Sequence, residues 1–223
     1  MSKPTPVHIS VVLDRSGSMA RIADDVVGGF NTFLDEQRKQ EGGGRVTLAQ
    51  FDGQDPFEVL IDGGDLDSVQ DLDPARYIPR GNTPLYDAVG RMIAKIDAEI
   101  VERADAGKPI EDQVVVIVTD GYENASREFS GKMLSELIEA RRGRAWAFVF
   151  LGADESTFEE GAAIGVSSAN TAQWDATGEG TAAMFSRVSQ ATSSYRGMGP
   201  AGRATASERF LQAETDTDDE VES

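Results

Sequence analysis

VVLDRSGSMA, residues 11–20, joins an apolar run to a group of polar side chains. Together with the preceding VHIS it makes a β-branched apolar stretch of strand length, which is typical of a strand buried on both faces of a sheet. The apolar run then passes directly into Asp14, Ser16 and Ser18. Packing gives no reason for three oxygen-bearing side chains at the end of a buried strand, whereas a bound cation does. The stretch predicts a first strand that ends at a cation site.

Strand-like and helix-like segments alternate along the rest of the chain. Strand-length apolar runs occur at VTLAQFD (46–52), FEVLID (57–62), QVVVIVTDG (113–121) and RAWAFVFLGA (144–153). Helical spacing of apolar residues occurs at 22–34, 85–100, 130–142 and 178–195. The short turn GQDP joins the first two of these runs and indicates an antiparallel pair. The pattern predicts an α/β fold, a doubly wound (Rossmann-like), mostly parallel sheet with one antiparallel edge strand and helices on both faces.

Capping residues mark the expected starts of several helices. Thr83 followed by Pro84 is typical of an N-cap and a first helical residue. Ser130 is expected to open the next helix, and Ser156 with Glu159 resembles a capping box. Taken alone, Thr83 is better explained as a helix cap than as a cation ligand.

The composition excludes several kinds of site and partner. The chain has no Cys, so disulfides, thiolate metal sites and a Cys nucleophile are absent, and its single His, His8, makes Ser-His-Asp catalysis unexpected. A net charge of −18 repels nucleic acid and is typical of a solubilising surface. No apolar run approaches the ~20 residues that span a bilayer, and the first residues do not resemble a signal peptide. We expect a soluble, cytoplasmic protein that binds no nucleic acid and does not insert into membranes.

The chemistry of the chain changes near Gly197. RGMGPAGR, residues 196–203, is typical of a flexible linker, and the last ten residues hold six acids and one apolar side chain. So little apolar surface does not offset the entropy lost on ordering. We expect one domain over residues 1–196, followed over 197–223 by a flexible linker and an acidic disordered tail.

Three oxygen-rich segments are expected to meet at one edge of the sheet. Ligands of open α/β sheets bind beyond the carboxyl ends of the strands. Asp14, Ser16 and Ser18 follow the first strand, Asp120 follows the strand that ends near 119, and Thr83 opens the helix of GNTPLYDA. Carboxylate and hydroxyl oxygens suit Mg²⁺, Mn²⁺ or Ca²⁺ better than zinc or copper. Turns and caps explain these residues one by one, but not the convergence of all five.

VVLDRSGSM, GNTPLYDA and TDGYEN, in this order, resemble the von Willebrand factor A (VWA) domain of the stand-alone bacterial type, with its metal-ion-dependent adhesion site (MIDAS). The resemblance implies that Ser16 and Ser18 ligate a metal through their hydroxyls and that Thr83 joins them when a ligand binds. It implies that Asp14 and Asp120 hold metal-bound waters. Mg²⁺ is the expected metal, with Mn²⁺ as the alternative and Ca²⁺ disfavoured.

The function implied by this resemblance is a divalent-metal-dependent protein-interaction module and not an enzyme. The partner would be a protein that supplies an Asp, a Glu or a C-terminal carboxylate. Stand-alone relatives work with AAA+ ATPases or in stress-response complexes, so such a component is an expected partner. Residues of the same loops are expected to line the rim that contacts the partner, although solvated loop residues are the plainer interpretation. These residues are Arg15, Asp52, Arg80, Asn82, Tyr122 and Glu123.

Two alternative functions stay open. The first is a metal-dependent phosphoryl-transfer enzyme, which would need a second acid two residues after Asp14, where this chain has Ser16. The second is a structural domain whose metal only orders the loops.

Overall fold

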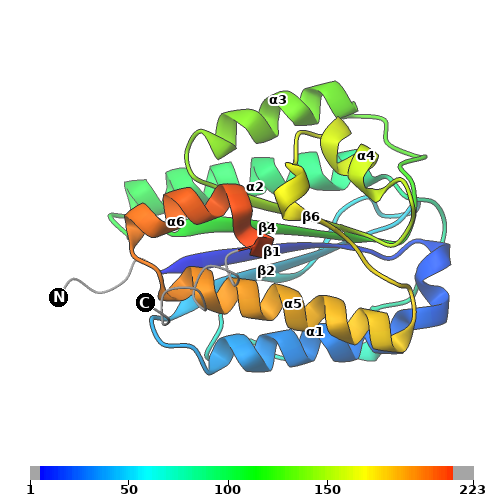
Figure 1. Cartoon of the computed structure of the whole chain (residues 1–223), viewed down its shortest axis with the longest axis horizontal. Helices are drawn as coiled ribbons and strands as arrows, with labels where there is room; N and C mark the ends of the chain where they lie inside the picture. Colours follow the sequence, from blue (N-terminus) through cyan, green and yellow to red (C-terminus); the bar gives the residue numbers. More distant parts are fainter. Residues whose placement is uncertain (1–5, 213–223) are drawn as a thin grey trace, which may run out of the picture.

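A six-stranded sheet forms the centre of the computed structural model, which describes residues 6–212 (Figure 1). The strands are β1 (Val7–Asp14), β2 (Gly44–Phe51), β3 (Glu58–Asp65), β4 (Asp112–Thr119), β5 (Ala147–Gly152) and β6 (Thr171–Gln173). The α-helices are α1 (Ala23–Arg38), α2 (Leu85–Asp105), α3 (Gly131–Arg142), α4 (Thr157–Ala163), α5 (Gly178–Gly197) and α6 (Pro200–Ala206). Four 3₁₀ helices complete the described chain: η1 (Gly17–Ile22), η2 (Pro74–Arg76), η3 (Ser168–Asn170) and η4 (Ser207–Gln212).

The strand order is β3-β2-β1-β4-β5-β6, and it places β1 and β4 side by side at the centre. β2 and β3 pair antiparallel, and all other pairs are parallel. The chain builds outward from β1 on one side, returns through α2, and builds outward from β4 on the other. The strand order therefore reverses between β1 and β4, and this is where open α/β sheets bind ligands. The predicted doubly wound sheet with one antiparallel edge strand is confirmed.

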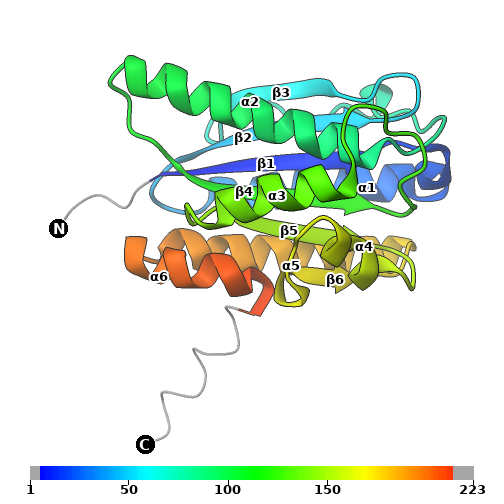
Figure 2. The ribbon, with the colours of Figure 1, turned by 90° about the horizontal axis from the view of Figure 1, so that it is seen from above.

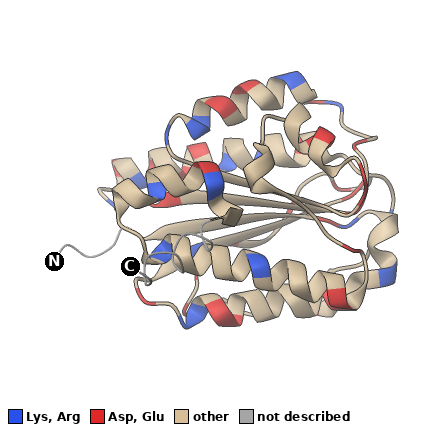
Figure 3. Ribbon diagram, viewed as in Figure 1, with Lys and Arg blue, Asp and Glu red and all other residues tan. Residues whose placement is uncertain are grey.

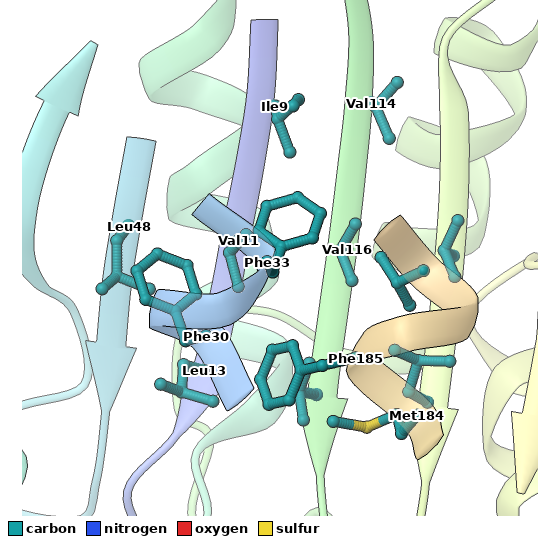
Figure 4. Packing of buried hydrophobic residues seen from close by; sticks show 14 of the residues in the cluster. Ile9, Val11, Leu13, Phe30, Phe33, Leu48, Val114, Val116, Met184 and Phe185 are labelled. Atoms are coloured by element: carbon teal, nitrogen blue, oxygen red, sulfur yellow. The ribbon is translucent and has the colours of Figure 1, made fainter. Parts of the chain in front are cut away.

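Alternate residues of the central strands face two separate helix layers. Ile9, Val11 and Leu13 of β1 pack with Phe185 of α5 and with α1 on one face (Figure 4). Val12 belongs to the opposite layer, which contains the buried side of α2 and α3. Figures 1 and 2 show α2 and α3 over one face of the sheet and α1 and α5 over the other. Every residue of β1 is buried, as expected of a parallel strand covered on both sides.

Two of the predicted capping sites behave differently from each other. Ser130 caps α3, because its side chain accepts a hydrogen bond from Met133 N over 3.3 Å. The capping box at Ser156 does not form, since Ser156 Oγ donates to Asp154 Oδ1 over 2.6 Å and no side chain caps α4. The short edge strand β6 was not predicted from the sequence.

The segment from Gly197 to Gln212 is folded, so the prediction of a flexible linker is wrong for these residues. Helices α6 and η4 fold back onto the sheet, where Phe210 is fully buried and Leu211 is 5% exposed. Arg203 donates from Nη1 to Asp112 Oδ2 over 2.7 Å at the start of β4. Two buried apolar side chains and a buried guanidinium hold this segment, although its average composition is linker-like. The domain extends at least to residue 212, and the tail from 213 to 223 lies outside the described residues.

Two further features describe the helices and loops, namely their charge and their hydropathy. Lys and Arg residues and Asp and Glu residues are both distributed along the outer helices and the loops (Figure 3). Within residues 6–212, no helix is both long enough and apolar enough to cross a membrane.

Candidate metal centre

The last residue of β1, Asp14, is fully buried and both of its carboxylate oxygens are engaged. Oδ1 accepts a hydrogen bond from Ser16 N over 2.6 Å, and Oδ2 accepts one from Thr119 Oγ1 over 2.6 Å. Tyr77 donates its hydroxyl hydrogen to the Asp14 carbonyl over 2.5 Å. Asp14 thus fixes the turn that carries the two serines and ties it to the end of β4.

Three side-chain oxygens from the segments that follow the two central strands form a chain of short contacts. Ser18 Oγ donates to Asp120 Oδ1 over 2.5 Å, and Ser16 Oγ lies 3.1 Å from Ser18 Oγ. The second oxygen of Asp120, Oδ2, is buried without a hydrogen bond from any described residue. Arg21 Nη2 lies 3.6 Å from it, which is an ion-pair distance but too long for a hydrogen bond.

Thr83 joins this group and does not cap helix α2. The helix begins at Leu85, Pro84 is the flanking residue, and no side chain caps this end, so the N-cap prediction is wrong. A Cβ built on Gly121 would lie 3.6 Å from Thr83 Oγ1 and 3.6 Å from Ser18 Oγ. The two hydroxyls therefore lie close to the same spot beside Gly121. Thr83 is 3% exposed.

Backbone hydrogen bonds hold two of the three loops together. Gly17 N donates to Gly81 O over 3.1 Å, and Arg80 N donates to Arg15 O over 2.9 Å. Gly81 has a φ of 68°, in the left-handed region that favours glycine, which explains the glycine of GNTP. The loop after β1 is therefore positioned directly by the loop before α2.

The loop after β4 is joined to the other two through Asn124. Asn124 Oδ1 accepts from Thr83 N over 3.0 Å, and Asn124 N donates to Thr83 O over 3.1 Å. Thr83 is therefore held on both sides of its peptide backbone while its hydroxyl remains available.

The two carboxylates of the site are short of positive charge. Burial raises the pKa of Asp14 to about 7, and the charge of Asp120 adds to the rise, although hydrogen bonds from Thr119 and Ser16 oppose it. Burial also raises the pKa of Asp120, against the hydrogen bond from Ser18 and the positive charge of Arg21. A cation between the loops would reverse both shifts, because it favours the ionised carboxylates.

The donor set fits a hard divalent cation held largely by hydroxyl oxygens. Within residues 6–212, no three His, Asp, Glu or Cys side chains form a group that could hold a metal. The oxygens that converge come instead from Ser16, Ser18, Thr83 and two carboxylates, Asp14 and Asp120. Such oxygens are the ligands that Mg²⁺ and Mn²⁺ take. Asp120 Oδ2 is buried without a hydrogen bond from the described residues, so it is a polar atom that a bound cation would satisfy.

Two of the predicted rim residues, Arg15 and Asp52, lie in the interior. Their side chains are 4% and 0% exposed and form an ion pair. Asp52 also accepts from Gln54 N over 2.7 Å and from Arg80 Nε over 3.0 Å. Burial alone raises the pKa of Asp52, but these hydrogen bonds outweigh it and hold the pKa below its usual value. A buried pair cannot contact a partner, so the rim prediction is wrong for both residues.

The remaining rim residues lie at the surface or in the loop. Asn82 is exposed, Tyr122 is 55% exposed, and the Arg80 side chain is 40% exposed. Glu123 is committed internally, because it accepts from Tyr86 N over 2.9 Å and from Ser126 N over 2.7 Å. Asn82 and Tyr122 are thus accessible to a partner, Arg80 is partly accessible while its Nε holds Asp52, and Glu123 orders its own loop.

Sequence reasoning missed several residues that hold the site in shape. Thr119 precedes Asp120 in the motif and could have been suspected, because a hydroxyl at the end of a buried strand needs a partner. Tyr77 and Asn124 act from loops with no periodic pattern, and nothing local indicates their contacts with Asp14 and Thr83.

Comparison with known proteins identifies the fold. No protein-family model and no curated protein sequence matches this chain. Proximal thread matrix protein 1 from the mussel byssus, with a zinc-occupied MIDAS motif, matches with a TM-score of 0.61 at 15% identity, covering 86% of this chain and 47% of that chain. A von Willebrand factor type A structure from Catenulispora acidiphila matches with a TM-score of 0.56 at 12% identity, over 86% and 43% of the two chains. Manganese-loaded TRAP of Plasmodium vivax matches with a TM-score of 0.50 at 17% identity, over 81% and 72%.

The chain has the VWA fold. It spans less than half the length of the mussel and Catenulispora proteins that it matches. Two of the matched structures hold a divalent metal, zinc in one and manganese in the other.

Proposed function

We propose that this protein is a divalent-metal-dependent interaction module that binds an acidic group of a partner protein. One observation carries the proposal: Ser18 Oγ bridges to Asp120 Oδ1 over 2.5 Å while Ser18 Oγ and Thr83 Oγ1 both approach Gly121. Oxygens from three loops are brought together at the point where the strand order reverses.

The residues of the site divide into two roles. Ser16, Ser18 and Thr83 would hold the metal through neutral hydroxyls, and Asp14 and Asp120 would orient those hydroxyls and balance the charge. A divalent cation held mainly by neutral oxygens remains electrophilic and accepts a carboxylate from another molecule. The hydrogen bonds that Asp14 accepts from Ser16 N and from Thr119 Oγ1 keep the turn in place before any ligand binds.

We propose Mg²⁺ as the metal, with Mn²⁺ as the alternative. Three small hydroxyl ligands and waters suit the short, near-octahedral coordination of Mg²⁺ better than the larger shell of Ca²⁺. Manganese in the Plasmodium protein and zinc in the mussel protein are consistent with a site of this fold that takes small divalent ions.

A non-catalytic role is supported by the state of Asp14. A phosphoryl-transfer enzyme with a nucleophilic aspartate at this position needs an accessible carboxylate oxygen. Asp14 is 0% exposed, and each of its oxygens already accepts a hydrogen bond. The position two residues later, where such an enzyme needs an acid, holds Ser16.

We also propose the class of the partner and the cellular compartment in which it is bound. The acidic composition supports a partner other than nucleic acid. The resemblance to stand-alone bacterial VWA proteins supports a cytoplasmic partner that belongs to an AAA+ ATPase or stress-response complex.

A pull-down with three versions of the chain tests this proposal. The wild type, Ser18→Ala and the exposed control Ser186→Ala are each incubated with a lysate of the source cells, in Mg²⁺ or in chelator. We expect one set of proteins to be retained by the wild type and by Ser186→Ala in Mg²⁺ only. Ser18→Ala should lose that set. Retention of the same proteins by all three versions in chelator would contradict the proposal.

A further inference from the structure

A polar hollow of about 550 Å³ lies beside the candidate metal centre. Two of the three loops that carry the site, the loop before α2 and the loop after β4, form its walls together with the loop after β2 and the start of α2. Gly53 and Gln54 come from the loop after β2, Asn82 and Pro84 flank Thr83, and residues 124–128 come from the loop after β4. The hollow is therefore a neighbour of the metal centre and not a separate cavity elsewhere in the fold.

Thr83 lies in the chain between two residues that line the hollow. Its neighbours Asn82 and Pro84 line the hollow, while its hydroxyl points to the spot beside Gly121 that Ser18 also approaches. Asn124, another lining residue, holds Thr83 through two hydrogen bonds of 3.0 and 3.1 Å. A group bound at Thr83 is therefore close to residues that line the hollow.

Four charged residues line the hollow, and three of them are already committed. Asp87 is buried and accepts from the backbone N–H groups of Arg127, Glu128 and Phe129 over 2.8, 2.9 and 2.9 Å. Arg91 donates from Nε to Glu128 Oε2 over 3.0 Å. The guanidinium of Arg127 is exposed and makes no hydrogen bond or ion pair with any residue between 6 and 212. Arg127 therefore supplies a positive charge in the hollow that is available to a ligand.

We propose that the hollow is a second subsite of the same interaction surface, and that Arg127 there binds a second carboxylate of an acidic partner segment. This inference rests on the proposed function, because it assumes that a first carboxylate of the partner binds the metal. A guanidinium forms strong, charge-assisted hydrogen bonds with a carboxylate, and often two at once. The partner that fits both subsites is a peptide segment with two acids close together in sequence.

Local contacts must provide this recognition, because the whole protein is acidic. At physiological ionic strength, charges further apart than about 8 Å are largely screened. The distant charges that make up the net charge of −18 therefore repel a bound acidic peptide only weakly. In an extended peptide, side chains two residues apart point to the same side. We expect two acids at this spacing to reach both subsites best.

The test is a binding titration of the full chain with capped Gly/Ser peptides at physiological salt, in Mg²⁺ and in chelator. One peptide carries a single Asp, and three others carry a second Asp one, two or three residues further on. The variants are Arg127→Gln and the control Arg144→Gln. Arg144 is exposed between α3 and the amino end of β5, whereas the hollow lies beyond the carboxyl ends of the strands. This control therefore makes the same charge change away from the hollow.

In Mg²⁺, we expect the second Asp to tighten binding about tenfold in the wild type and in Arg144→Gln. Arg127→Gln should remove that gain and leave the single-Asp peptide unaffected. A single-Asp peptide that binds in Mg²⁺ without any gain from a second Asp would overturn this inference and leave the proposed function standing. A gain that depends on Arg127 but persists in chelator would support the Arg127 subsite and contradict the metal-dependent function. No binding of any peptide in either condition would contradict both.

Discussion

Ser18 and Asp120 are joined by a hydrogen bond of 2.5 Å although 102 residues separate them in the chain. Ser18 follows β1 and Asp120 follows β4, the two central strands between which the strand order reverses. The other oxygen of Asp120 is buried without a hydrogen bond from the described residues. This contact shows that the topology of the sheet, and not the local sequence, creates the candidate metal centre.

Substitution of Thr83 distinguishes a metal ligand from a helix cap. Thr83→Val keeps the shape of the side chain and removes its hydroxyl, whereas Thr83→Ser keeps the hydroxyl. We expect Thr83→Val to weaken metal-dependent ligand binding at least about tenfold. Thr83 does not cap α2, so the unfolding free energy of Thr83→Val should differ from that of the wild type by less than the ~0.5–2 kcal/mol that a lost cap costs. Thr83→Ser should retain binding. Urea unfolding and ligand titration of both variants provide the check, and a destabilised Thr83→Val with intact binding would restore the capping role.

Asp120→Asn should abolish metal binding without weakening the metal-free fold. Burial of the Asp120 carboxylate raises its pKa, so the charged form is disfavoured in the metal-free protein. A neutral amide of the same size removes that penalty. Melting temperature in chelator should therefore be equal to or above that of the wild type, while calorimetric binding of Mg²⁺ disappears. Asp105→Asn, at the exposed end of α2, is the control and should change neither quantity. A large fall in melting temperature for Asp120→Asn alone would contradict this account.

His8 should make the fold less stable in acid. Burial lowers the pKa of His8 from 6.5 to about 4, with help from the charges of Arg45 and Lys95 and against that of Glu99 and a hydrogen bond with Gln113. Between these two pH values the unfolded chain holds a proton that the folded chain does not. The unfolding free energy therefore falls as the pH drops from about 6.5 to 4, by at most about 3 kcal/mol from this group.

Asp14 has the opposite effect, because its raised pKa lets the folded protein take up a proton below about pH 7. The test is therefore the difference between the wild type and His8→Gln, in which Gln replaces the ring nitrogen that contacts Thr47 Oγ1 at 2.8 Å. That difference in unfolding free energy should shift in favour of His8→Gln as the pH falls through this window. His8 is the single histidine of the chain, so a proton NMR titration reads its pKa directly. A measured pKa near 6.5 in the folded protein would refute the prediction.

The C-terminal segment should be part of the cooperative fold as far as residue 212. Phe210 is fully buried, and its ring lies 5.3 Å from that of Tyr195, centroid to centroid. We expect Phe210→Ala to lower the unfolding free energy by about 3–5 kcal/mol, as for other buried aromatic deletions. Phe158→Ala on α4, where the side chain is 46% exposed, is the matched control and should cost less than about 1 kcal/mol. Equal small effects in the two variants would show that the segment does not stabilise the domain.

The fold and the five converging residues could be predicted from the sequence because their signals are local and strong. The apolar run that ends at Asp14 and the run that ends at Asp120 each mark a buried strand and its carboxyl edge. The order of strands and helices then brings those ends together. Burial of β1 on both faces follows from its unbroken apolar character.

Other features could not be predicted because they depend on contacts between distant segments. Arg15 and Asp52 look like loop charges in the sequence, and only the sheet brings them together as a buried ion pair. The glycine- and proline-containing segment from 197 hides a helix that is held by Arg203 and Phe210. Thr83 has the sequence signature of a cap, but Pro84 takes the flanking position and leaves its hydroxyl for the site.

Titration calorimetry with Mg²⁺ on the full chain and on Ser18→Ala tests the central claim most directly. Both proteins carry the same acidic residues, so weak binding by surface carboxylates cancels in the comparison. We predict one saturable Mg²⁺ site per wild-type chain, tighter than the site for Ca²⁺, and its loss in Ser18→Ala while the melting temperature in chelator is unchanged. Identical Mg²⁺ isotherms for the two proteins would contradict the account.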